Sequence, residues 1–220
     1  MENTYKLGIV DEYEGDINTL FRFFDLYYPE IEIVTIELSP DINQIIDNII
    51  SSHVDAVAID FNLNEYAKIP FPFQGNIILD TLEKLLPDFP AMIFTNYTAD
   101  SEKTSPKPDS FLVIQKKYFT PKYKDSEGLE FARKIKSKIE KYKRNLAEKQ
   151  EQLIALHNKQ MKVELTLPEQ TELIELDEYL EKATGGKSFL PKDWKKPDTL
   201  KKINDLADTA EKLLAELKKQ

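Results

Sequence analysis

Five polar residues follow short apolar runs in the first half of the chain, and their types suit metal binding and phosphoryl chemistry. They are Asp11, Glu12, Asp60, Thr95 and Lys116. Apolar runs of this length, rich in valine and isoleucine, are typical of buried parallel strands. Ligands of doubly wound sheets bind beyond the carboxyl ends of the strands. We therefore expect the five side chains to meet at one edge of a sheet.

Three of these residues are carboxylates, and their grouping favours a divalent cation. Asp11, Glu12 and Asp60 would repel one another and raise one another's pKa unless a cation neutralised them. A few oxygen ligands, completed by waters and a backbone carbonyl, suit Mg²⁺. Lys116 and Thr95 would supply a positive charge and a hydrogen-bond donor for an incoming phosphoryl group.

Composition limits the other kinds of site. The chain has 220 residues, no cysteine and two histidines, which excludes thiol chemistry and a histidine-rich metal centre. Residues 1–128 carry 10 Lys/Arg against 22 Asp/Glu, a balance of −12, and residues 129–220 have a balance of +3. Direct nucleic-acid binding is not expected from these balances. No apolar run approaches the roughly 20 residues of a membrane helix, and the N-terminus opens a strand, so we expect no membrane contact and a cytoplasmic location.

The first 125 residues alternate strand-like and helix-like segments, which is the pattern of βαβ units around a parallel sheet. The expected strands cover residues 5–10, 31–36, 54–60, 91–95 and 111–116. The first helix is expected over residues 16–27, with Phe21 among its inward residues. The second should begin at Ser39 and Pro40, a good cap and first helical residue. The third should begin near Gly75.

Two finer expectations concern the helices. Ile77 and Leu85 are expected on the inward face of the third helix. The connection over residues 98–110 contains two prolines and is so polar that a full fourth helix is not expected.

After Ser126 the pattern changes to one long helix, expected over residues 126–162. Its apolar residues keep the 4,3 spacing of a coiled coil, with Lys149 interrupting the seam. They are Ile135, Ile139, Tyr142, Leu146, Leu153 and Leu156. Two further helices are expected over about 167–183 and 198–218. The stripe could close an intramolecular bundle with these helices or pair two chains into a homodimer. The expected domains are thus residues 1–125 and a helical module over residues 126–220.

The first domain resembles the receiver domain of bacterial two-component response regulators. Asp11 and Glu12 in LGIVDE match that family's acidic pair. Asp60 in AVAIDFN matches its phosphoacceptor. Thr95 in MIFTN and Lys116 in VIQKK match its hydroxyl and lysine positions.

The resemblance extends to two further positions and departs at two others. Asn62 matches the residue whose backbone carbonyl completes the metal shell, and Gly75 the glycine that opens the third helix. Val113 stands where the family has an aromatic residue, so the aromatic switch is missing or has moved to Phe111. Lys117 replaces the family's proline, which leaves it as the alternative to the preferred Lys116.

The resemblance implies a flavodoxin-like, doubly wound five-stranded parallel sheet of order 2-1-3-4-5, followed by an all-α coiled-coil module. It implies that Asp60 accepts a phosphoryl group from a histidine kinase or phosphotransfer protein, with Thr95 and Lys116 holding the phosphoryl oxygens. Mg²⁺ would be bound by Asp11, Glu12, Asp60 and Asn62. Apart from Mg²⁺-dependent self-phosphorylation and autodephosphorylation, no enzymatic activity is implied. The output would be contacts between the helical module and an unidentified effector protein.

Two alternatives remain open. The chain could be a receiver-like scaffold or adaptor that is never phosphorylated, since the end of the fifth strand departs from the family. A Mg²⁺-dependent phosphohydrolase ranks lower, because Asn62 stands where a second carboxylate is expected.

An insertion over Glu65–Gln74 could cover the site or bind a partner.

Overall fold

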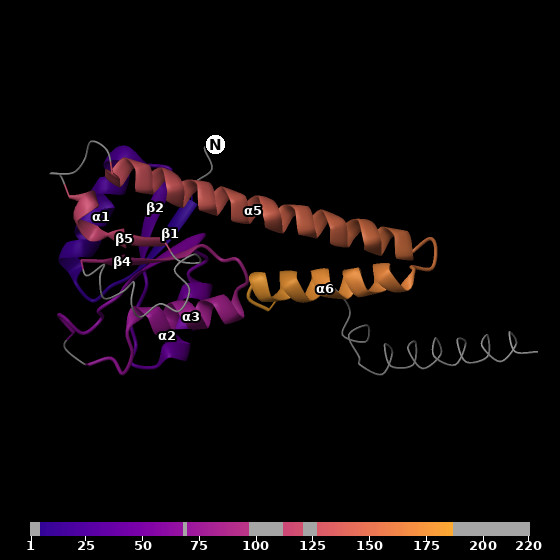
Figure 1. Ribbon diagram of the computed structural model, residues 1–220, viewed down its shortest axis with the longest axis horizontal. Helices are drawn as coiled ribbons and strands as arrows, with labels where there is room; N and C mark the ends of the chain where they lie inside the picture. The colour runs from indigo at the N-terminus through magenta and orange to yellow at the C-terminus, as the bar shows by residue number, and fades with distance from the viewer. Residues whose placement is uncertain (1–4, 68–69, 97–111, 121–126, 187–220) are drawn as a thin grey trace, which may run out of the picture. The chain divides into compact units, whose positions relative to one another are not determined.

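The fold is a single parallel sheet of five strands with helices on both faces (Figure 1). It is taken from a computed structural model that describes residues 5–67, 70–96, 112–120 and 127–186. The strands are β1 (Tyr5–Val10), β2 (Ile31–Thr35), β3 (Ala56–Asp60), β4 (Ala91–Thr95) and β5 (Leu112–Gln115). Their order in the sheet is β2-β1-β3-β4-β5. The predicted flavodoxin-like architecture is confirmed.

Helices cover the sheet in two layers. They are α1 (Glu14–Tyr27), α2 (Ile42–Ser51), α3 (Gly75–Leu85) and the first part of α5 (Glu127–Gln160). Figure 1 shows α1 and α5 on one face and α2 and α3 on the other. Every residue of β3 and β4 is buried, because both of their faces carry helices.

Each face of the sheet has its own apolar core. Ile45 of α2 and Ile78 of α3 pack in one core. Phe24 of α1 and Ile135 of α5 pack in the other, together with Phe119 from the short 3₁₀ helix η1 (Lys116–Phe119) that follows β5. The site described below therefore stands on elements that are fixed from both sides.

Three apolar residues predicted to face inward lie on the surface instead. Phe21 is 54% exposed, Ile77 43% and Leu85 47%. On α1 the neighbouring Phe23 is buried in place of Phe21, because its ring makes an edge contact with Phe119 at 4.9 Å between centroids. Successive residues turn by about 100° around a helix, so a sheet buries only part of a wide apolar stripe.

Helix α2 begins two residues later than predicted. Asp41, not Ser39, is its N-cap, and the Asp41 carboxylate accepts the backbone N–H of Asn43 at 2.9 Å. The Ser39 hydroxyl instead accepts the N–H of Asp41 at 3.1 Å. Pro40 therefore belongs to the turn that precedes the cap and not to the first helical turn.

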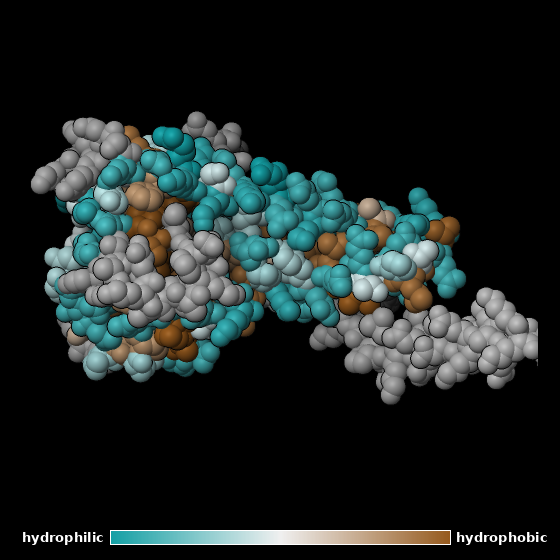
Figure 2. All heavy atoms as spheres, in the orientation of Figure 1, coloured by the Kyte–Doolittle hydropathy of each residue, from teal (hydrophilic) through white to brown (hydrophobic). Residues whose placement is uncertain are grey.

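The apolar stripe of α5 packs in two different environments, one in each compact unit. Ile135 and Ile139 are fully buried in the core beside the sheet, so this part of the stripe is not a coiled-coil seam. Figure 2 shows mainly hydrophilic residues on the visible side of α5. The chain divides into two compact units between Glu148 and Lys149, within α5.

The second unit contains the end of α5 and α6 (Leu167–Ala183). Lys149 places its ammonium 4.4 Å from the centroid of the Tyr179 ring, and Lys159 forms an ion pair with Glu169. Leu153 is buried in this unit. These contacts tie the end of α5 to α6.

Several predictions lie outside the described residues. They concern the connection over residues 98–110, the aromatic residue Phe111 and the helix over 198–218. Among the helices that the structure describes, none combines the length and the hydropathy needed to cross a bilayer.

Candidate functional site

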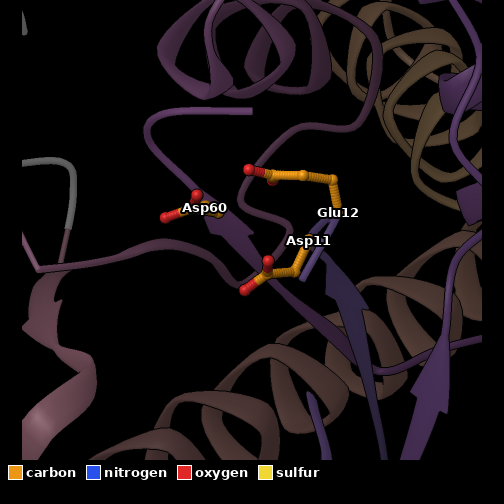
Figure 3. A group of neighbouring side chains, drawn as sticks. All are labelled: Asp11, Glu12 and Asp60. Atoms are coloured by element: carbon orange, nitrogen blue, oxygen red, sulfur yellow. The ribbon is translucent and has the colours of Figure 1, made fainter. Parts of the chain in front are cut away.

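Three carboxylates meet where β1 and β3 end. Asp11 and Glu12 follow β1, and Asp60 is the last residue of β3. The two strands are paired with Val10 opposite Ile59, so their ends are level. Carboxylate oxygens of the three residues lie within 4.8 Å of one another. Figure 3 shows the side chains extending from the two strand ends into the same space.

Lys116 reaches into this group of acids. Its Nζ atom lies 2.8 Å from Asp11 Oδ2 and 3.0 Å from Asp60 Oδ1. It also lies 2.8 Å from Asp16 Oδ2 on α1. Lys116 is buried as the first residue of η1, whereas Lys117 is exposed. Of the two lysines considered, the structure brings Lys116 to the carboxylates.

The pocket holds more negative charge than its lysine can balance. Burial raises the pKa of Asp60 to about 7, opposed by Lys116 and reinforced by the charge of Asp11. Burial is also the main cause that raises the pKa of Asp11 and of Glu12. Burial alone would lower the pKa of Lys116, but Asp60 and Asp11 outweigh it and raise that pKa. Such a pocket favours bound protons or a bound cation.

Glu12 presents an oxygen that the surrounding protein leaves unused. Its Oε1 atom accepts the backbone N–H of Tyr66 at 3.1 Å. Its Oε2 atom is shielded from solvent and has no hydrogen-bond partner among the described residues. An unsatisfied carboxylate oxygen beside two further carboxylates fits a hard cation with oxygen ligands. The residues present therefore fit Mg²⁺.

Two tyrosines lie beside Glu12. The rings of Tyr13 and Tyr66 are stacked, with centroids 4.5 Å apart and planes at 26°. The Tyr13 N–H donates to Asp11 Oδ1 at 2.9 Å. Because Tyr66 belongs to the insertion over Glu65–Gln74, the start of that insertion is held against the acidic pocket.

Thr95 is the last residue of β4, and Asn62 lies just after the end of β3. Thr95 is fully buried at the end of β4, and Asp60 pairs with Phe94, so Thr95 lies one residue beyond the level of Asp60. Asn62 lies in the turn after β3, where its carbonyl accepts the N–H of Glu65 at 3.4 Å. Both residues are on the edge of the sheet that carries the acids.

Gly75 begins α3 directly against the backbone of Asp60. A Cβ atom at this position would stand 2.0 Å from the Asp60 carbonyl oxygen. The Gly75 N–H also donates to the carbonyl of Phe61 at 3.0 Å. Only a residue without a side chain permits this approach.

Asp16 was not predicted as a site residue, because it lies on a helix and not at the end of a strand. Asp16 lies in the first turn of α1, where an acidic side chain is favoured by the helix dipole. That turn follows β1 after three residues, which brings Asp16 near the strand end. The signal in the sequence was an acidic residue in the first helical turn after Asp11 and Glu12, since such a residue lies near the end of β1.

Comparisons with known proteins find matches among solved structures. No protein-family model matches the chain, and no curated protein matches it. A response regulator receiver domain protein from Methanospirillum hungatei matches in structure with a TM-score of 0.43 and 15% identity, over 64% of this chain and 98% of that one. The response regulator TrrA from Thermotoga maritima, solved in complex with Mg²⁺-BeF, matches with a TM-score of 0.43 and 16% identity, over 60% of this chain and 99% of that one.

A third solved structure covers more of the chain. RcsB, a response regulator from Salmonella typhimurium studied for its DNA interaction, matches with a TM-score of 0.40 and 11% identity, over 84% of this chain and 94% of that one. All three solved structures are of response regulators.

Proposed function

We propose that the chain is a response regulator in which Asp60 accepts a phosphoryl group from a histidine kinase or phosphotransfer protein. One observation carries this proposal. Asp60 ends β3, is 6% exposed, and lies in contact with Lys116 and close to Asp11 and Glu12. A buried carboxylate that shares its pocket with further acids and one lysine is suited to phosphoryl chemistry.

In the proposed reaction a carboxylate oxygen of Asp60 attacks the phosphorus of a phosphohistidine. The new O–P bond forms as the P–N bond breaks, and the imidazole nitrogen keeps the bonding electrons and takes a proton from solvent. Lys116 and Thr95 would hold the phosphoryl oxygens through an ammonium and a hydroxyl. Asp60 must be ionised to act as the nucleophile.

The residues that would hold Mg²⁺ are Asp11, Glu12 and Asp60, with the backbone carbonyl of Asn62. When bound, the ion would supply positive charge that offsets the carboxylates and the phosphoryl group. The buried Glu12 Oε2 atom, which has no hydrogen-bond partner among the described residues, supports this assignment.

The proposed output begins at Lys116. This residue opens η1, and Phe119 at the end of η1 stacks on Phe94 at 5.1 Å and on Phe24 at 5.8 Å between ring centroids. The same core contains Ile135 of α5. A move of Lys116 toward a phosphoryl group would therefore change the packing of η1 against α5. Helix α5 continues into the second unit.

We further propose that the second unit docks an effector protein or pairs two chains, and that the protein works in the cytoplasm. The partners would recognise the described α5 and α6 surfaces. Direct nucleic-acid binding is not part of the proposal, because residues 1–128 are strongly acidic.

The test uses trifluoroberyllate, a phosphoryl analogue, and acetyl phosphate. The wild-type chain should bind trifluoroberyllate only with Mg²⁺ and should gain about 80 Da with acetyl phosphate, the mass of one phosphoryl group. Asp60→Asn should do neither. Asp47→Asn, which makes the same change at an exposed position of α2, should behave as the wild type. Equal binding by wild type and Asp60→Asn would refute the assignment.

One observation favours a second candidate, a receiver-like scaffold that is never phosphorylated. Val113 is partly buried and packs against the core where the resembled family has an aromatic residue. The same experiment separates the two functions. A wild-type chain that takes up neither analogue nor phosphoryl group would favour the scaffold.

A further inference from the structure

Lys116 has a third carboxylate partner that the proposed metal site does not use. Asp16 Oδ2 lies 2.8 Å from Lys116 Nζ, as close as the oxygen of Asp11. The Lys116 ammonium donates a hydrogen bond to Asp16 in addition to forming an ion pair with it. Asp16 comes from α1, whereas the other partners come from the ends of β1 and β3.

The three contacts use the whole donor capacity of the lysine. An ammonium group has three N–H donors, and Lys116 directs them at Asp11, Asp16 and Asp60. A phosphoryl oxygen that needs one of these donors must displace a carboxylate. Asp11 and Asp60 have the proposed cation as a second partner, but Asp16 is not in the cluster of potential metal ligands.

Building on the proposed function, we infer that Asp16 is a positioning residue that holds Lys116 in the phosphate-free pocket and competes with the phosphoryl group for it. The Asp16 side chain is 26% exposed, so it lies at the solvent side of the pocket. It can turn toward water when the lysine leaves, at less cost than a buried acid would incur.

Asp16 opposes the phosphoryl group in two ways that act in the same direction. It occupies an N–H donor of Lys116, and it places a negative charge beside the lysine that the anion needs. Asp16→Asn removes the negative charge and leaves only a neutral amide oxygen, a weaker acceptor for the Lys116 N–H, so both effects are reduced. The same loss of negative charge disfavours a cation that binds alone. The inference therefore predicts opposite shifts for the anion and for Mg²⁺.

The experiment compares Asp16→Asn with Asp25→Asn in the full chain. Asp25 is an exposed residue of the same helix, so the control removes the same charge away from the pocket. Mg²⁺ binding is measured by calorimetry, and trifluoroberyllate binding at saturating Mg²⁺ is followed by fluorine NMR. Thermal unfolding of each variant establishes that it is folded.

Asp16→Asn should bind trifluoroberyllate roughly three- to tenfold tighter than the wild type, the size expected for a partly exposed charged pair. Its affinity for Mg²⁺ alone should be lower than that of the wild type. Asp25→Asn should match the wild type in both measurements. Asp16→Glu, which keeps the charge, should return the analogue affinity toward the wild-type value.

Three distinct results would overturn the inference. If Asp16→Asn binds the analogue no more tightly than Asp25→Asn, Asp16 does not compete and the proposed function stands. If the wild type itself does not bind the analogue with Mg²⁺, the phosphoacceptor function and the role of Asp16 both fail. A purely structural role would weaken both affinities and lower the unfolding temperature together.

Discussion

The first residue of α3, Gly75, lies so close to Asp60 that a Cβ atom would stand 2.0 Å from the Asp60 carbonyl oxygen. Gly75→Ala must therefore shift either the start of α3 or the end of β3, and we expect a loss of about 2 kcal/mol in the free energy of unfolding. Urea denaturation measures this loss. Asn76→Ala, at the next position of α3, is the control. Its buried Oδ1 atom has no hydrogen-bond partner among the described residues, so its removal breaks no hydrogen bond of that atom. Equal stability of the two variants would contradict the close approach.

Lys116 and Lys117 are neighbours in the sequence, but only Lys116 contacts the carboxylates of the pocket, whereas Lys117 is exposed. Lys116→Met leaves the carboxylates of the pocket without their cation, and we expect a loss of about 3 kcal/mol in unfolding free energy at pH 7. Lys117→Met, at an exposed position, should change stability by less than about 0.5 kcal/mol. Denaturation curves of both variants give the comparison. Added Mg²⁺ should restore part of the loss in Lys116→Met only.

The pKa of Asp60 gives the metal-free protein a pH-dependent stability. Burial raises this pKa to about 7 from an ordinary value of 3.8, so between these values the folded chain binds a proton that the unfolded chain has released. Stability must then fall as pH rises through this window, by at most about 1.4 kcal/mol per pH unit. Urea midpoints between pH 4 and pH 8 measure the slope. Asp60→Asn should show a smaller fall, and an unchanged slope would refute the assignment to Asp60.

Binding of Mg²⁺ should depend on pH in the opposite sense. The ion competes with the proton on Asp60, whose pKa lies at about 7. Its affinity should therefore rise between pH 5 and pH 7, by at most about tenfold per pH unit, and level off above pH 8. Calorimetric titrations at three pH values test this. A constant affinity would mean that Asp60 does not take part in binding the ion.

Helix α5 offers a test of its two surroundings. Ile139 is fully buried in the core beside the sheet, whereas Ile154 in the second unit is 51% exposed. Ile139→Ala should lower the free energy of unfolding by about 2 to 4 kcal/mol. Ile154→Ala makes the same chemical change and should cost less than about 1 kcal/mol. Comparable losses would contradict the burial of Ile139 and the exposure of Ile154.

Local sequence pattern was sufficient to find the strands and the acids. β1 and β4 have the predicted bounds, because a run of apolar residues buried on both faces has few other stable conformations. Parallel strands place their carboxyl ends at one edge, so the grouping of Asp11, Glu12 and Asp60 followed from the order of the strands. The start of α2 was placed two residues early because a serine and an aspartate can both cap a helix.

The sequence by itself determined the sheet, its acidic edge and the identity of the carboxylates that could bind a cation. Only the tertiary structure decided that Lys116 and not Lys117 enters the pocket, that Asp16 joins it, and that Tyr66 donates to Glu12. The physical reason is the range of the interactions. Backbone pairing and burial repeat along a strand and leave a periodic signal. Contacts between residues as distant in sequence as Asp16 and Lys116 depend on where packing places each side chain. The local hydrophobic pattern of the sequence carries no information about that placement.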